Sequence, residues 1–347
     1  MRSILTINSG STSLKYKLID LDDFRIMAEN NLQGIESHSE AFKRTLREVG
    51  NLSAVKVVGH RVVHGGDEFF EPVEITKEVL KKIESYSNLA PLHNPYNLAG
   101  VRASNEFIPN IPDFAVFDTA FYRDLPDRAK IYGLPYEFYK EHGIRRFGFH
   151  GISHKYVAME AAKELKKELK DLNLVTCHLG GGVSITAIKK GKAIDTSMGF
   201  TPMEGPMMMT RCGDIDPGVV LKLKDSLNGN DKGMVGRILN KASGIKGISG
   251  IDDFLTLLEA VGNGDERAKL AFEIYTYRIE KYIGGYLAIL GGADALVFTG
   301  QVGAGKATTR NKITKDLDKI LGRTKVLTIE TDEELMIAKE IAEKLGK

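Results

Sequence analysis

Alternating hydrophobic and polar positions predict two hairpins about half a chain apart. Residues 4–19, ILTINSGSTSLKYKLI, and residues 174–188, LVTCHLGGGVSITAI, each run from a β-branched stretch through a turn of glycine and hydroxyl residues into a second alternating stretch. This pattern is typical of two antiparallel strands joined by a tight turn. The two hairpins either are unrelated or mark an internal duplication.

Between and after the hairpins, strand-like runs alternate with amphipathic helical stretches. Residues 153–169 place Tyr156, Val157, Ala161 and Leu165 at helical spacing. The alternation predicts an α/β protein. Further strands are expected at 54–58, 114–117, 295–299 and 325–329, and further helices at 265–290 and 332–345.

Length and composition indicate a soluble protein of two domains. The 347 residues exceed one ordinary core, which favours a ligand cleft between two domains. Hydrophobic residues make up 42% and charged residues 27%, near the averages for globular proteins. Disordered, collagen-like and membrane classes are therefore disfavoured.

The charge balance and the cysteines indicate which binding partners and which cellular compartment to expect. Lys and Arg total 48 against 46 for Asp and Glu, so nothing indicates a nucleic-acid partner. No segment approaches the roughly 18 apolar residues of a membrane span, and the N-terminus does not resemble an export signal. Cys177 and Cys212 lack metal-type spacing and are too few for a disulfide framework. We expect a cytoplasmic protein.

The first hairpin carries candidate chemistry at its tip. Asn8, Ser11, Ser13 and Lys15 recur at spacings of two or three, and the spacing predicts that the last three share one face of a strand. A turn of this kind offers backbone N–H groups, hydroxyls and an ammonium to one anion. The hairpin is therefore a candidate phosphate site.

Four further segments concentrate residues that a core does not require. Arg61 and Arg211 lie among apolar and glycine residues rather than among other charges, which favours ligand binding over exposed cations. His150 and His154 have a spacing seen in zinc sites, but Gly151 and Ser153 intervene and no acidic third ligand is evident, so a metal site is disfavoured. For His60, His64 and His154, a hydrogen-bonded structural role fits as well as a functional one. The segments are GHRVVHGG at 59–66, LAPLHNPYN at 89–97 with FDTAF at 117–121, RRFGFHGISH at 145–154, and residues 195–216.

The segment GQVGAGKA at 300–307 offers an alternative class of nucleotide site. It follows an apolar strand and matches the phosphate-binding loop GxxxxGK[ST] except at Ala307, where the magnesium-binding hydroxyl is missing. Too little chain follows to complete a P-loop domain. The glycines still indicate a turn that faces a nucleotide.

Taken together, the motifs resemble the acetate kinase family in that family's order. The matching segments cover residues 4–217 almost without interruption. They are INSGSTSLKY, GHRVVHGG, LAPLHNP, FDTAF, IRRFGFHGISHKYV, HLGGGVS, DTSMGFTPMEG and MMMTRCGDIDP.

The resemblance implies a fold, a reaction and an assembly. The fold is α/β, with two domains around a duplicated sugar-kinase or actin-like (ribonuclease H-like) core and a cleft between them. Residues 1–120, completed by the helix at 335–347, form the N-terminal domain, and residues 121–334 form the nucleotide-binding domain. The reaction is reversible phosphoryl transfer between ATP and acetate, giving acetyl phosphate and ADP with Mg²⁺ or Mn²⁺. The assembly is a homodimer.

The site residues implied by the resemblance fall into four groups. The two arginines among them suit phosphoryl transfer to a carboxylate, because guanidinium groups bind carboxylate and phosphate bidentately and neutralise charge on a transferred phosphoryl group. The catalytic residues are Arg61, Asp118, His150 and Arg211, and the acid-binding residues are Arg61, Val63, Leu92, His93, Phe149 and Pro202. The phosphate and nucleotide residues are Ser11, Ser13, Lys15, His178, Gly180, Gly181, Gly182, Asp253, Gly300, Gln301, Val302 and Gly303, and the metal-associated residues are Asn8 and Glu333.

Departures from the family pattern concentrate at the adenine end of the donor site. Gln301 stands where the family has a small glycine, and Leu255 stands where it usually has an arginine. The chain is also shorter than typical members. These departures keep open a pyrophosphate or other nucleotide donor, and a non-catalytic relative that acts as a sensor or scaffold. Propionate also stays open as the acid, because a pocket distinguishes one methylene by only about 1–3 kcal/mol.

Overall fold

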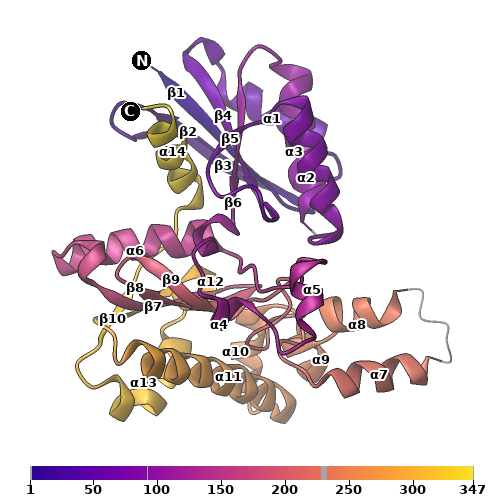
Figure 1. Cartoon of the computed structure of the whole chain (residues 1–347), viewed down its shortest axis with the longest axis vertical. Helices are drawn as coiled ribbons and strands as arrows, with labels where there is room; N and C mark the ends of the chain where they lie inside the picture. Colours follow the sequence, from indigo (N-terminus) through magenta and orange to yellow (C-terminus); the bar gives the residue numbers. More distant parts are fainter. Residues whose placement is uncertain (1, 92, 228–232, 347) are drawn as a thin grey trace. The chain divides into compact units, whose positions relative to one another are not determined.

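The structure, a computed structural model, divides into two compact units, each built around one mixed β-sheet (Figure 1). The described residues are 2–91, 93–227 and 233–346. Unit 1 comprises Met1–Arg123, Phe149–Tyr156 and Asp332–Lys347, and unit 2 comprises Asp124–Gly148 and Val157–Thr331.

The sheet of unit 1 has six strands in the order β3-β2-β1-β4-β6-β5. Its strands are β1 (Ser3–Ser9), β2 (Ser13–Asp20), β3 (Ile26–Gln33), β4 (Val55–Val62), β5 (Val73–Glu74) and β6 (Asp113–Phe117). Strands β1 and β2 form the antiparallel hairpin predicted from the alternation. Strand β4 runs parallel to both β1 and β6, so the ends of these three strands meet at one edge.

Helices cover both faces of this sheet, because successive side chains of a strand point to opposite faces. Leu5 and Ile7 pack with Phe42 of α1 in one core cluster. On the other face, α14 approaches so closely that a Cβ on Gly59 would lie 2.7 Å from the Ile341 side chain. The helices of unit 1 are α1 (His38–Val49), α2 (Lys77–Ser85), α3 (Asn94–Phe107) and α14 (Glu333–Lys344).

A carboxylate of α1 ties that helix to the hairpin edge of the sheet. Glu48 accepts hydrogen bonds from Asn30 at 2.9 Å, from Arg44 at 2.8 Å and from the Tyr16 hydroxyl at 2.8 Å. The bonds from Asn30, Arg44 and Tyr16 lower the pKa of Glu48 to about 2.

The sheet of unit 2 repeats the connectivity of the first. Its order is β11-β10-β7-β8-β9, so an antiparallel three-strand meander is again extended by two parallel strands. The predicted fold of a duplicated core is therefore confirmed. The strands are β7 (Asn173–Leu179), β8 (Val183–Lys189), β9 (Lys192–Thr196), β10 (Ala295–Thr299) and β11 (Lys325–Thr328).

Local signals set the ends of the long helices. In α11 (Glu266–Leu290), the Asp265 side chain accepts from the Ala268 amide, and Gly291 ends the helix in the left-handed conformation. Helix α6 (Gly151–Leu165) ends before the predicted residue 169, because Lys166 has a φ of 54°. The other helices of unit 2 are α4 (Asp127–Lys130), α5 (Tyr136–Lys140), α7 (Pro217–Ser226), α8 (Met234–Lys241), α9 (Gly244–Ser249), α10 (Phe254–Gly262), α12 (Gly300–Gly303) and α13 (Ala307–Leu321).

The hydropathy of the described helices agrees with the lack of a long apolar segment in the sequence. Within residues 2–91, 93–227 and 233–346, no helix combines the length and the apolar character needed to cross a bilayer.

Candidate active site

Polar side chains gather where the parallel strands of unit 1 end, on the face that α14 covers. The register pairs Asn8 of β1 with Lys15 of β2, and Ile7 with His60 of β4, so Asn8 lies beside Arg61. Because these residues share one face of the sheet, their side chains point the same way. The strand pairing alone therefore brings together an amide, an ammonium and a guanidinium.

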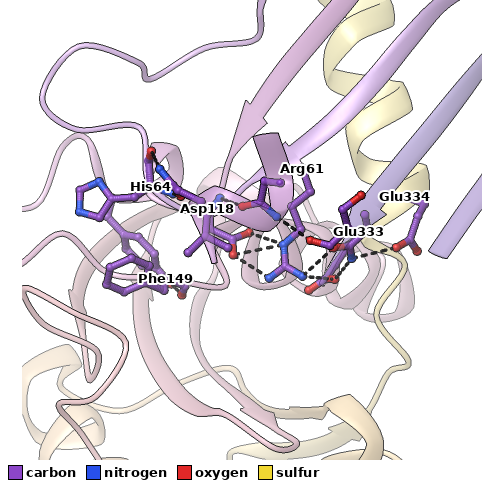
Figure 2. Close-up of polar contacts among 12 residues, drawn as sticks. Arg61, His64, Asp118, Phe149, Glu333 and Glu334 are labelled. Carbon is purple, nitrogen blue, oxygen red and sulfur yellow. Dashed lines mark hydrogen bonds and ion pairs between the residues drawn. The ribbon is translucent and has the colours of Figure 1, made fainter. Parts of the chain in front are cut away.

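Arg61 is held by carboxylates from two other elements (Figure 2). Its Nη2 donates to Asp118 Oδ2 at 2.6 Å, and its Nε donates to both oxygens of Asp118 at 3.1 and 3.2 Å. Its Nη1 donates to Glu333 Oε2 at 3.1 Å and to Asn8 Oδ1 at 3.5 Å. Arg61 is therefore an oriented cation.

The first turn of α14 supplies acidic residues to the hairpin. Lys17 Nζ pairs with Asp332 Oδ2 at 2.6 Å, and Lys15 Nζ pairs with Glu334 Oε2 at 2.6 Å. Glu334 is fully buried, and its Oε1 accepts from the Asn8 amide at 3.2 Å. Carboxylates at a helix N-terminus are favoured by the helix dipole. The predicted phosphate-binding Lys15 is thus held by an internal anion in this structure.

Burial and charge oppose each other at the Arg61 and Asp118 pair. Burial alone would lower the pKa of Arg61, but Asp118 and Glu333 raise it above its ordinary value. Burial raises the pKa of Asp118, and Glu333 adds to this effect, while Arg61 counteracts it. Net negative charge around this guanidinium favours a further cation.

The segment that leads into α6 completes the surroundings of Asp118. The backbone N–H of His150 donates to the Asp118 carboxylate, and the Gly151 N–H donates to the Asp118 carbonyl at 3.0 Å. His150 has a φ of 57°, an uncommon conformation that concentrates at functional sites. The next residue toward the N-terminus, Phe149, is fixed by the Tyr122 hydroxyl, which donates to its carbonyl at 2.8 Å.

The predicted acid-pocket residues of unit 1 lie close to this segment. Val63 and Phe149 are buried, and the Phe149 ring meets the His64 ring edge-on at 5.5 Å (Figure 2). His93 is half-buried at the N-terminus of α3. Leu92 lies outside the described residues.

Two asparagines that sequence reasoning did not single out fix this edge of the sheet. Asn97 accepts from the Val63 amide at 3.1 Å and donates to the Ser9 carbonyl at 2.8 Å, which joins the ends of β4 and β1. Asn94 accepts from the His64 amide at 3.0 Å and donates to the His64 carbonyl at 3.1 Å. Both side chains are buried. The LHNPYN segment contained the signal, since two amides at three-residue spacing share a helix face.

One expectation for the hairpin tip is wrong. Ser13 and Lys15 belong to β2, but Ser11 lies in the turn and does not share a strand face with them. The turn closes through the Gly10 amide, which donates to the Ser13 carbonyl at 2.8 Å. A tight turn of this kind takes Ser11 out of the two-residue alternation.

Arg211 of unit 2 is a partly buried cation whose surroundings differ from those of Arg61. Its Nη1 donates to the Pro202 carbonyl at 3.0 Å, and its backbone is folded into a turn by the Met208 amide, which donates to the Arg211 carbonyl at 3.1 Å. Among the described residues of unit 2, no carboxylate pairs with it, and burial lowers its pKa. Gly244, with a φ of +65°, is required there because a Cβ would lie 2.7 Å from the Arg211 carbonyl oxygen.

The second hairpin contributes a glycine turn. His178 is the penultimate residue of β7, and Gly180, Gly181 and Gly182 connect it to β8. The Gly180 amide donates to the Gly182 carbonyl at 3.0 Å. A Cβ on Gly181 would meet nothing within 4 Å, so this turn leaves its backbone open to a ligand.

The end of β10 lies against the end of β7. Gly300 has a φ of +81°, and a Cβ there would lie 2.5 Å from the Leu179 carbonyl oxygen, which excludes any larger residue. Gly300–Gly303 forms the short helix α12 rather than an open phosphate-wrapping loop. Val302 and Gly303 are buried, whereas Gln301 is exposed.

Asp253 has a structural role in this structure. It is the N-cap of α10, and its Oδ2 accepts from the Thr256 amide at 2.8 Å and from the Thr256 hydroxyl at 2.9 Å. These bonds lower the pKa of Asp253.

Comparison with known proteins identifies the family. Residues 24–339 match the Acetokinase family. The chain belongs to the acetokinase family. It is 44% identical over 393 residues to the acetate kinase of Halothermothrix orenii, covering 98% of each chain. It is 42% identical over 402 residues to the acetate kinase of Thermotoga maritima, covering 99% of this chain and 100% of the relative.

Solved structures of acetokinases share the fold. Acetate kinase of Porphyromonas gingivalis superposes with a TM-score of 0.88 at 37% identity, over 100% of both chains. Propionate kinase of Francisella tularensis superposes with a TM-score of 0.91 at 36% identity, over 98% of this chain and 99% of that one. The family resemblance predicted from the motifs is therefore confirmed. The 393 aligned positions also exceed the 347 residues of the chain, so the relative contains segments that this acetokinase lacks.

Proposed function

We propose that the protein is a carboxylate kinase that transfers a phosphoryl group reversibly between ATP and acetate. In the forward direction an acetate oxygen forms a bond to the γ-phosphorus while the bond from that phosphorus to the oxygen of ADP breaks, giving acetyl phosphate and ADP. The observation that carries this proposal is the partly buried Arg211 guanidinium, which pairs with no carboxylate among the described residues of its own unit. A partly desolvated cation without a counter-charge is costly, and an anionic substrate would relieve that cost.

The described contacts support distinct roles for the two arginines. Arg211 would neutralise the equatorial oxygens of the phosphoryl group in the transition state, where most of the catalytic effect of such sites arises. Arg61 is already oriented by Asp118, so it would present its remaining donor capacity to the acid without a large ordering cost. His150 would add a hydrogen bond to the transferred group. Val63, Phe149 and Pro202 would surround the methyl group.

The residues around Arg61 also fit a magnesium ion bound together with the donor. Among residues 2–91, 93–227 and 233–346, no three His, Cys, Asp or Glu side chains form a metal-type cluster. Mg²⁺ commonly needs only one or two protein oxygens, because phosphate oxygens and waters complete its shell. Asn8 and Glu333 supply such oxygens, and the buried or partly buried carboxylates of Asp118, Glu333 and Glu334 face the cations Arg61 and Lys15 there. When bound, Mg²⁺ would neutralise charge on the donor phosphates.

The donor phosphates would extend along the glycine turns. Ser11, Ser13 and Lys15 would contact them from the first hairpin, and His178 with Gly180–Gly182 from the second. Lys15 would then exchange its bond to Glu334 for a phosphate oxygen. Asp253, Gly300, Gln301, Val302 and Gly303 would lie toward the nucleoside.

A matrix of acids and donors tests the proposal. Purified protein is assayed for acyl phosphate by hydroxamate formation, with acetate and propionate against ATP, GTP and pyrophosphate. We expect acetyl phosphate from acetate and ATP, and a loss of about three to five powers of ten in kcat for Arg211→Ala. Absence of acyl phosphate in every combination would refute the proposal and favour a non-catalytic sensor or scaffold. Near-normal kcat in folded Arg211→Ala would exclude the role of that residue.

Two alternative substrates have specific support. The propionate kinase likeness supports propionate as an acid, and one methylene changes affinity by only about 1–3 kcal/mol. The exposed Gln301 supports a donor other than ATP, because its side chain would crowd the space beside a base where a glycine would not. The same matrix decides both.

The family resemblance also supports a homodimer located in the cytoplasm. Light scattering on purified protein at micromolar concentration tests the dimer, for which we expect twice the 38.2 kDa chain mass.

A further inference from the structure

Arg146 of unit 2 makes an unusual set of hydrogen bonds for a residue outside the predicted site. Its side chain is mostly buried, with 15% of its surface exposed. Its Nε donates to the Ala129 carbonyl at 3.2 Å, and its Nη2 pairs with Glu204 Oε1 at 2.5 Å. Its Nη1 donates to three successive carbonyls, those of Thr196, Ser197 and Met198, at 2.9, 3.1 and 3.1 Å.

Glu204 links this guanidinium to a third segment. Its second oxygen accepts a short hydrogen bond from the Tyr132 hydroxyl, which in turn accepts from the Phe200 amide at 2.8 Å. A Cβ on Gly199 would overlap both the Glu204 carboxylate and the Tyr132 hydroxyl, so only glycine fits beside the pair. We call Arg146, Glu204 and Tyr132 the Arg146 clamp.

The Arg146 clamp fixes both ends of residues 196–204, a stretch that contains the candidate site residue Pro202. Arg146 binds the backbone at the end of β9 and the side chain of Glu204. The Pro202 carbonyl is the acceptor for Arg211 Nη1 at 3.0 Å. The position of the Arg211 guanidinium therefore depends on a backbone that Arg146 and Glu204 hold.

A second anchor holds the other side of the same loop. Asp214 accepts from the Gly205 amide at 2.8 Å and from the Tyr282 hydroxyl of α11 at 2.7 Å. Residues 196–214 are thus fixed at both sides by directional polar contacts, in addition to the burial of Met198 and Met207–Met209 in the core. Loops held in this way can place a charged group accurately, because each bond is directional.

We propose that Arg146 and Glu204 are positioning residues that set the location of Pro202 and Arg211 for the acid and the transferred phosphoryl group. This inference rests on the proposed function. Neither residue belongs to the predicted catalytic or binding set, and both act through the loop rather than by contact with substrate. Arginine is required at 146 because the planar guanidinium donates in several directions at once, whereas a lysine ammonium cannot span three carbonyls, Ala129 and Glu204.

The electrostatics of the clamp agree with this role. Burial alone would lower the pKa of Arg146, but Glu204 raises it above its ordinary value. Arg146 therefore stays charged, and its bond to Glu204 is charge-assisted.

The test compares Arg146→Lys, Glu204→Gln and the double variant with Arg128→Lys. Arg128 is an exposed arginine of α4 in the same unit, so its substitution is a matched control for the loss of one guanidinium. Each variant is assayed with acetate and ATP for kcat and both KM values. Melting temperature and far-UV circular dichroism give the folded fraction.

We expect Arg146→Lys to lower kcat/KM for acetate by about a hundredfold, the effect of a displacement near 1 Å at a reacting centre. KM for acetate should rise while KM for ATP stays near the wild-type value, and Arg128→Lys should match wild type. The double variant should lose less than the product of the two single losses, because the two residues share one contact.

Three results would overturn the inference. One is an unchanged KM for acetate together with a lower kcat that falls only in proportion to the folded fraction. A purely structural role would give this result. Another is additivity of the two substitutions. The third is activity of Arg146→Lys equal to that of Arg128→Lys. If Arg146→Lys does not fold, the KM of Glu204→Gln decides. Wild-type protein without acetyl phosphate formation would instead refute the proposed function, and the inference with it.

Discussion

Removal of the Asn97 side chain should loosen the strand ends that carry Arg61 and Val63. Asn97→Ala deletes a buried amide that bonds the Val63 N–H at 3.1 Å and the Ser9 carbonyl at 2.8 Å. Asn105 on the same helix is the matched control, because it is exposed and its amide donates to the Val101 carbonyl one turn away, at 3.1 Å.

The expected magnitude follows from the two groups left unpaired. A buried backbone donor or acceptor that loses its partner costs about 1–3 kcal/mol. The Val63 amide should therefore open more easily by that amount, which corresponds to exchange about ten to a hundred times faster, since 1.4 kcal/mol is a factor of ten. Asn105→Ala should stay within about 0.5 kcal/mol, as is usual for exposed positions.

Native-state hydrogen exchange at the Val63 amide is the appropriate assay. The chain contains two compact units, so one global free energy of unfolding is not a well-defined quantity, whereas a single amide reports its own opening. Equal exchange at Val63 in Asn97→Ala and Asn105→Ala would refute the idea that the asparagine fixes this edge of the sheet.

Two more predictions concern charged groups of unit 1. Asp118→Asn should lower kcat by about a hundredfold, because Arg61 loses the bidentate partner that orients it; acid and donor kinetics close to wild type would contradict this. Glu48→Gln should destabilise the protein at pH 7, because the pKa of Glu48 is lowered to about 2 in the folded state against about 4.3 when unfolded. The advantage of wild type should shrink as the pH falls from about 4.3 to about 2; melting temperatures of both proteins across that range would test it, and a constant gap would exclude the effect.

The elements that sequence could predict are those set by local signals. Both hairpins follow from period-two alternation around glycine turns, and α11 follows from Asp265 before it and Gly291 after it. The parallel strands β4 and β6 follow from short buried runs. These features need only neighbouring residues, so the pattern along the chain contains them.

The contacts that sequence could not predict join distant segments. The pairing of Arg61 with Glu333 links residues 272 positions apart, and no periodicity reports it. Asn97 looks like an ordinary residue of a helix start until α3 is placed against β1 and β4. Ser11 was expected on a strand face because the spacing could not show where the turn begins. In each case tertiary packing decides what local spacing leaves open.

The place of α14 in the chain has a consequence for synthesis on the ribosome. Residues 332–346 are synthesised long after β1, yet they cover one face of a sheet that begins at residue 3 and bring Glu333 to Arg61. A nascent chain therefore displays Ile4 and the uncovered Gly59 strand to solvent, with Arg61 lacking its helix partner, until α14 has been synthesised. Deletion of α14 would leave that apolar face uncovered, so a chain truncated before residue 332 should aggregate instead of folding into a shortened enzyme.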